Sequence, residues 1–76
     1  MTRSAELVPG VLVRDAVLDR VGEVREVRGR RVYLRPPAGG REWEADPEKL
    51  TVLGEAEALR VRVAVENRRS RSGDLR

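Results

Sequence analysis

Apolar and charged residues alternate along 31–35 and again along 42–46, on the two sides of a Pro-Pro-Ala-Gly-Gly stretch. Side chains of a strand point alternately to opposite faces, so this pattern predicts two strands joined as a hairpin. With Pro36 opposite Arg41, apolar residues meet on one face and arginines meet carboxylates on the other. A shift by one residue would destroy both matches. The predicted pairs are Arg35–Glu42, Leu34–Trp43, Tyr33–Glu44, Val32–Ala45 and Arg31–Asp46.

This register predicts that Leu34 and Trp43 belong to the core and that the charged face of the hairpin is exposed to solvent. Gly39 and Gly40 suit the connecting loop, because glycine adopts positive φ angles without steric cost. The two prolines before them cannot donate a ladder hydrogen bond, which ends the pairing.

The residues on either side of the hairpin predict three further strands, over 11–15, 21–27 and 51–53. The loop between the first two contains Val17 and Leu18, and we expect one of these side chains to point into the core. A three-residue loop then connects the second strand to the hairpin.

That loop ends at Gly29, which we expect at the left-handed position of a β-bulge. The resulting register pairs Val24 with Val32, which adds Val24 to the core. It also places Arg25 close to Arg31 on the outer face, and this like-charge contact would suit an anionic ligand.

Asp46 and Pro47 predict one turn of helix before the last strand, because Asp caps helices well and Pro suits the first helical position. The fold class is therefore mainly β: a small five-stranded SH3-like barrel with a one-turn helix before the last strand, followed by a short C-terminal helix. We expect a flexible arm over 1–7, the barrel over 8–53, a C-terminal helix or added strand over 54–67, and a disordered basic end over 68–76.

The segment before the basic end fits two structures. Apolar residues alternate with arginine and alanine from Leu59 to Val65, which is a strand pattern. A helix would instead dock Ala56, Leu59 and Val63 on the barrel. In that helix Val61 and Val65 would point away from the barrel, so periodicity alone does not choose between the two.

The chain has 76 residues, a net charge of +3, no Cys and no His. This length predicts one domain with a small core. The composition excludes disulfides and thiolate chemistry, and it removes the commonest general base and metal ligand. No apolar run is long enough to span a membrane. We therefore expect a non-enzymatic cytoplasmic protein with no catalytic residue, no cofactor, no metal site and no membrane association.

Three runs of residues carry a resemblance: VRDAVLDRVGEV, VYLRPPAGGREWEADPEKL and VENRRSR. Together, over roughly residues 11–71, they resemble a group of short uncharacterised proteins from actinobacteria in which GGREW and DP-x-x-L recur as a unit. The resemblance implies a cytoplasmic protein with a small SH3-like barrel and a C-terminal helix, and it favours the helix for the tail. The strand layout is also similar to that of KOW and Tudor-like modules.

Two surfaces are candidates for binding. Arginines surround the single tyrosine on the outer face of the predicted hairpins, where Tyr33 could stack on a base of a nucleic acid. The apolar tail could contact a protein partner or a second copy of the chain. The candidate nucleic-acid face is Arg25, Arg31, Tyr33, Arg35 and Arg41, and the candidate partner interface is Leu59, Val61, Val63 and Val65.

Overall fold

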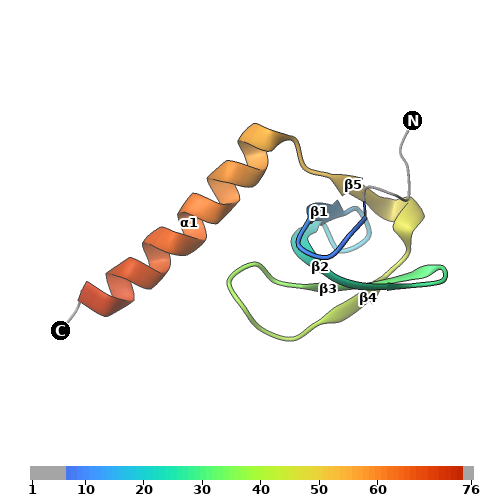
Figure 1. The fold of residues 1–76 in the computed structure, drawn as a ribbon, viewed down its shortest axis with the longest axis horizontal. Coiled ribbons are helices and arrows are strands. Elements are labelled where there is room, and N and C mark those ends of the chain that lie inside the picture. The colour runs from blue at the N-terminus through green and yellow to red at the C-terminus, as the bar shows by residue number, and fades with distance from the viewer. Residues whose placement is uncertain (1–6, 75–76) are drawn as a thin grey trace.

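The computed structural model describes residues 7–74, with side chains described as far as Arg68. The fold is mainly β, with one antiparallel sheet in the order β4-β3-β2-β1-β5 and a helix, α1, after the last strand (Figure 1). The strands are β1 (Leu12–Asp15), β2 (Arg20–Arg28), β3 (Arg31–Arg35), β4 (Trp43–Ala45) and β5 (Leu50–Val52), and the helices are the short 3₁₀ turn η2 (Pro47–Lys49) and α1 (Glu55–Asp74).

The sheet is open rather than closed into a barrel. Strands β4 and β5 form its two edges, and within residues 7–74 no ladder of hydrogen bonds joins them. The sheet nevertheless curves, and the indole Nε1 of Trp43 on β4 reaches across it to donate to Asp15 Oδ2 on β1 at 2.9 Å. In the order of the sheet these two strands are separated by β2 and β3.

The predicted register of the β3–β4 hairpin is confirmed over the whole ladder. Gly39 and Gly40 adopt positive φ angles of 99° and 132°, and the Gly39 N–H donates to the Pro36 carbonyl at 2.9 Å. The outermost predicted pairs lie beyond the ladder, because β4 is only three residues long. The observed pairs are Leu34–Trp43, Tyr33–Glu44 and Val32–Ala45.

The predicted turn between β2 and β3 is wrong. Arg28 pairs directly with Arg31, which leaves a two-residue turn with positive φ at Gly29. A positive φ at the first central residue alone is typical of a type II′ turn. The irregularity predicted at the turn lies instead inside β2, at Arg25, so Val24 pairs with Leu34 and not with Val32. Arg25 and Arg31 are therefore not the like-charge neighbours that the sequence predicted.

The core lies on the concave side of the curved sheet and consists of small and medium apolar residues. Val13, Val24, Val32 and Leu34 are fully buried. Trp43 is half-buried and packs against this cluster. Residues 1–6 of the predicted flexible arm lie outside the described residues. The remaining buried apolar residues are Leu7, Leu12, Ala45, Leu50 and Leu53.

The one-turn helix η2 forms as predicted. Asp46 adopts an extended backbone conformation and its Oδ1 accepts the Glu48 N–H at 2.9 Å, while Pro47 occupies the first position. This turn connects β4 at one edge of the sheet to β5 at the other. It thereby brings Leu50 into the core.

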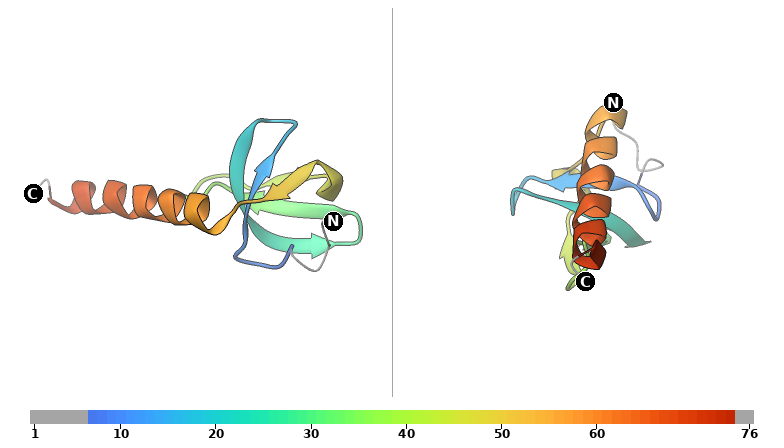
Figure 2. Two further views of the ribbon diagram at one scale, coloured as in Figure 1. Left: turned by 90° about the horizontal axis from the view of Figure 1, so that it is seen from above. Right: turned by 90° about the vertical axis from the view of Figure 1, so that its left-hand side faces the viewer.

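The tail is a helix, and it runs away from the sheet at a slant to the longest dimension of the molecule (Figures 1 and 2). The Ala58 N–H donates to the Gly54 carbonyl at 2.9 Å, which begins the helix. It continues to Asp74, whereas the sequence placed its end near residue 67 and a disordered end after that. The molecule consequently measures 45 × 25 × 20 Å.

Candidate functional site

The outer face of β3 and its neighbours carries the predicted cluster of arginines around Tyr33. Arg31 Nη1 lies 2.9 Å from Glu44 Oε2 on β4, and the Tyr33 hydroxyl lies 3.5 Å from the same oxygen. Arg25 Nε lies 3.6 Å from Glu42 Oε2. Two arginines of the candidate face are thus neutralised locally, one by Glu44 on β4 and the other by Glu42 just before β4.

A third ion pair lies at the end of this face, near the β2–β3 turn. Arg28 Nε donates to Glu26 Oε2 at 2.8 Å. The hydrogen bond and the negative charge of Glu26 raise the pKa of Arg28 above its usual value. The guanidinium therefore stays charged at every pH of practical interest.

Arg35 and Arg41 lie at the two ends of the loop that joins β3 to β4. Arg35 is opposite Glu23 in the β2–β3 ladder, and its Nε is buried without a hydrogen-bond partner among the described residues. Arg41 is exposed. The structure therefore brings Arg31 and Tyr33 together at Glu44 and places Arg25 beside Glu42, so this part of the candidate face is a mixed-charge surface.

The apolar tail residues do not form one surface. Helix α1 turns Val61 and Val65 toward the sheet, where both are half-buried together with Ala58. Leu59 and Val63 point to the opposite side and are 62% and 48% exposed. The predicted docking of α1 through Ala56, Leu59 and Val63 is wrong, because the face that meets the sheet is the other one.

Two polar contacts connect α1 to the sheet. Arg14 Nη2 on β1 lies 2.7 Å from Glu57 Oε2, and Arg62 Nη2 donates to the Gly10 carbonyl at 3.2 Å. Both contacts are exposed to solvent. Exposed ion pairs contribute about 0–1 kcal/mol each, so they orient the helix without holding it firmly.

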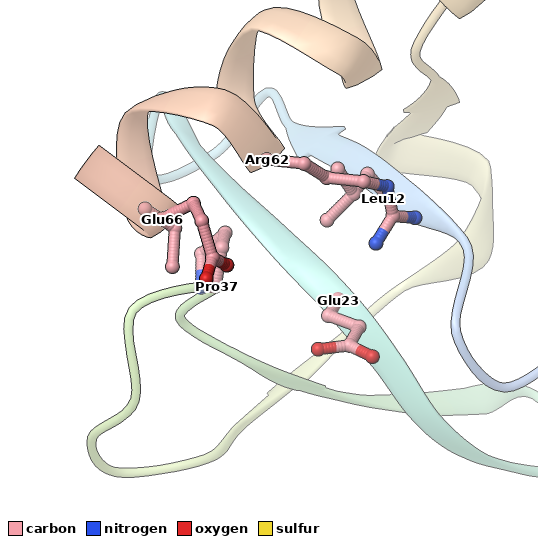
Figure 3. Close-up of a pocket in the computed structure, with 6 residues that line it drawn as sticks. Leu12, Glu23, Pro37, Arg62 and Glu66 are labelled. Atoms are coloured by element: carbon pink, nitrogen blue, oxygen red, sulfur yellow. The ribbon is translucent and has the colours of Figure 1, made fainter. Parts of the chain in front are cut away.

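A shallow cleft separates α1 from the sheet and the β3–β4 loop (Figure 3). Its volume is about 280 Å³. Three apolar side chains and three charged ones, an arginine and two glutamates, line it (Figure 3). The charges are mixed, which indicates no single class of ligand. The lining residues are Leu12, Glu23, Pro37, Arg62, Val65 and Glu66.

The sequence did not reveal a cluster built around Asp15. This side chain is 3% exposed, and its Oδ1 accepts the Val17 N–H at 2.9 Å while its Oδ2 accepts the Trp43 indole N–H. The guanidinium of Arg20 lies 4.2 Å from the centroid of the Trp43 ring. An Asp at the end of a strand, followed by a short loop, was the only signal for this arrangement.

The Asp15 cluster holds the β1–β2 loop with its apolar residues outward. Val17 and Leu18 are 69% and 50% exposed, so the prediction that one of them points inward is wrong. Asp19 adopts a positive φ of 54°, which Asp tolerates better than most residues and which lets the loop close. The hydrogen bonds to Asp15 set the loop conformation in place of apolar packing.

Charge is distributed unevenly along the chain. Residues 1–57, which include the first three residues of α1, contain ten basic and eleven acidic residues, a net charge of −1. Residues 58–76 contain six arginines and two acidic residues, a net charge of +4. The positive excess of the chain is therefore carried by the part of the chain after residue 57, whereas residues 55–76 as a whole carry +2.

The described part of the chain contains neither a metal-binding cluster nor a membrane-spanning helix. Among residues 7–74, no three His, Cys, Asp or Glu side chains are grouped as a metal ion would require. No helix in this part combines the length and apolar character needed to cross a membrane. Comparisons with protein-family models, with curated proteins and with solved structures found no match.

Proposed function

We propose that this protein is a non-enzymatic binding module in which a small SH3-like domain presents residues 58–76, the part of the chain after the first turn of α1, as a basic arm to nucleic acid. The observation that carries the proposal is the separation of charge: −1 over residues 1–57 and +4 over residues 58–76. Helix α1 runs away from the sheet (Figure 2), and its described arginines, Arg60, Arg62 and Arg68, are exposed. Phosphate groups are the ligands that such an arm attracts most strongly.

The SH3-like identity of the domain is part of this proposal. It is supported by five short antiparallel strands, tight hairpins and a 3₁₀ turn before the last strand. The pronounced curvature of the sheet, which the Trp43–Asp15 hydrogen bond stabilises, also fits it. Small barrels of this type support many unrelated functions, so the arm and not the fold carries the functional argument.

The sheet face around Tyr33 is the weaker nucleic-acid surface. Its arginines at positions 25, 28 and 31 are each paired with a glutamate. A phosphate would have to compete with those carboxylates for each guanidinium. The arm has no comparable excess of acidic residues, because Glu66 and Asp74 are its only two after residue 57.

Fluorescence anisotropy of labelled single- and double-stranded DNA and RNA tests the proposal, at ~50 and ~200 mM salt. Binding should weaken steeply with salt, since each phosphate contact releases counterions. A variant with Arg68, Arg69 and Arg71 changed to Gln should lose most of the affinity. The matched variant with Arg25, Arg31 and Arg35 changed to Gln carries the same loss of charge on the sheet face and should bind nearly as well as the unmodified protein.

If the sheet-face variant instead lost more affinity for nucleic acid than the arm variant, the binding site would lie on the sheet face. No binding at the lower salt concentration would refute the nucleic-acid proposal altogether. The arginines would then serve only to stabilise the helix, by complementing the negative end of its dipole.

A second candidate function is protein binding through α1. The specific observation in its favour is the exposure of Leu59 and Val63 on the side of the helix away from the sheet. A helix that lays such side chains into an apolar groove is a common mode of recognition.

A further inference from the structure

The side of α1 that faces away from the sheet carries a short apolar stripe. Ala56, Leu59 and Val63 are all exposed and recur at a spacing of three and then four residues, which places them on one side of the helix. This is the spacing by which two helices pack side by side in a coiled coil. The sheet lies behind the stripe, so it would not obstruct a second helix.

The α1 sequence mixes strong helix formers (Ala, Leu, Arg and Glu) with weak ones. Val61, Val63 and Val65 are β-branched, and Asn67 and Gly73 also have low helical propensity. The sheet supplies little packing, since no described residue of α1 is fully buried. Most helical stability in proteins comes from tertiary packing and not from propensity. A partner on the exposed stripe would supply the packing that the sheet does not.

The charged residues beside the stripe indicate which partner fits. If Ala56, Leu59 and Val63 occupy the core positions of a heptad, Glu55 and Arg60 occupy the two flanking positions. In a parallel pair of identical helices, the residue that precedes one core position on the first helix contacts a residue of the second helix. That residue lies five places later in the sequence and follows the next core position. Glu55 of each copy would thus meet Arg60 of the other. We propose that α1 pairs in parallel with α1 of a second copy of this chain.

An antiparallel pair of the same helices would be unfavourable. With Leu59 of each copy beside Val63 of the other, the two Arg60 side chains would lie close together on one flank. The two Arg62 side chains would meet on the other flank. Like charges in such positions repel each other, so the charge pattern distinguishes the two orientations.

The association is weak, because each copy contributes only three apolar side chains. Stable interfaces bury about 1,200–2,000 Å² in total, which this stripe does not reach. A dissociation constant on the order of 100 µM is expected for so small a contact. The inference is independent of the nucleic-acid proposal, because it concerns the free protein.

Sedimentation equilibrium without nucleic acid, from ~10 µM to ~1 mM, tests the inference across the expected dissociation constant. The mean mass of the unmodified protein should rise with concentration toward that of a dimer. Leu59→Ser should abolish the rise. Ala56→Leu should strengthen association about tenfold or more, since it adds apolar surface to the contact in both copies.

A charge exchange tests the parallel orientation. Arg60→Glu should weaken association roughly tenfold, because it places two carboxylates opposite each other on both flanks. The double variant Glu55→Arg/Arg60→Glu restores opposite charges at the original net charge and should recover most of the affinity. Arg68→Glu makes the same change of charge on the sheet side of the helix and should leave association unaltered.

A monomer at every concentration for both the unmodified protein and Ala56→Leu would overturn the inference. A dimer that the double variant fails to restore would overturn the parallel orientation. A dimer insensitive to Leu59→Ser would show that association uses another surface. Circular dichroism of each variant confirms that the sheet remains folded.

Discussion

The sheet and α1 are held in place by different means. Apolar residues from Leu7 to Leu53 form the buried core, and a buried carboxylate, Asp15, is satisfied by hydrogen bonds from both neighbouring and distant residues. In α1, the best covered side chains, such as Val61 and Val65, are only half-buried. The domain therefore folds around its own core, whereas the helix presents most of its surface to the outside.

This difference separates stability from binding within one short chain. Substitutions in the sheet should mainly change the free energy of unfolding. Substitutions on the exposed side of α1 should mainly change interactions with other molecules. Four predictions test that separation.

The largest expected effect is at Trp43. Its ring fills the space above Gly22, and its indole N–H donates to the buried Asp15. Trp43→Ala should reduce the free energy of unfolding by ~3–5 kcal/mol, measured by urea denaturation. Trp43→Phe retains most of the ring but removes the donor, so a smaller loss of ~1–3 kcal/mol is expected. A loss below ~1 kcal/mol for Trp43→Ala would show that the ring is not part of the stabilising core.

Gly22 should show the next largest effect. A Cβ at this position would lie 2.7 Å from Cη2 of Trp43 and 3.0 Å from Cβ of Leu34. Gly22→Ala should therefore cost ~1–3 kcal/mol of stability through overpacking. Gly54→Ala is a suitable control because a Cβ there meets nothing within 4 Å. Equal effects at both positions would contradict the close approach of the indole ring.

The contact between Arg14 and Glu57 should affect the helix without affecting the core. Arg14→Gln removes an exposed ion pair of 2.7 Å, so global stability should fall by at most ~1 kcal/mol. Backbone amides of α1 should exchange faster with solvent, as measured by hydrogen–deuterium exchange. Arg28→Gln breaks an ion pair remote from α1 and should leave exchange in the helix unchanged. The same rate of amide exchange in α1 for both variants would show that the Arg14–Glu57 ion pair does not orient the helix.

The smallest expected effect on stability is at Leu59. Because the side chain is 62% exposed, Leu59→Ser should change the free energy of unfolding by no more than ~0.5 kcal/mol at low protein concentration. A loss of ~2 kcal/mol or more would mean that Leu59 packs against the sheet, as the sequence predicted, and would reverse the orientation of α1.

The sequence predicted the register of the three β3–β4 pairs that form, because apolar alternation and charge pairing both required it. The predicted outer pairs Arg35–Glu42 and Arg31–Asp46 lie beyond the ladder, and Arg31 and Glu42 form ion pairs with Glu44 and Arg25 instead. The sequence also predicted the Asp46 cap, which depends only on local residues. The β2–β3 register was wrong because a bulge could lie either at Gly29 or at Arg25. A bulge at Arg25 interrupts the alternation within β2, so that Val24 and Val27, three residues apart, pair with Leu34 and Val32. Alternation along the sequence therefore did not reveal it.

The candidate sites were predicted less well than the sheet. The residues around Tyr33 do come together, but their partners depend on long side chains, whose positions alternation does not determine. In α1, the two possible apolar faces are nearly equivalent in sequence. The Arg14–Glu57 and Arg62–Gly10 contacts, which accompany the observed orientation, involve residues far apart in the chain.

Trp43 is the only tryptophan in the chain, so all indole fluorescence reports on one place. That place lies between the Arg20 guanidinium and Gly22, at a junction of β1, β2 and β4. Emission will therefore change when the sheet melts and remain constant when α1 detaches, pairs or captures a ligand. An optical titration that follows Trp43 would miss the events at α1, and a dye attached to the helix is needed to observe them.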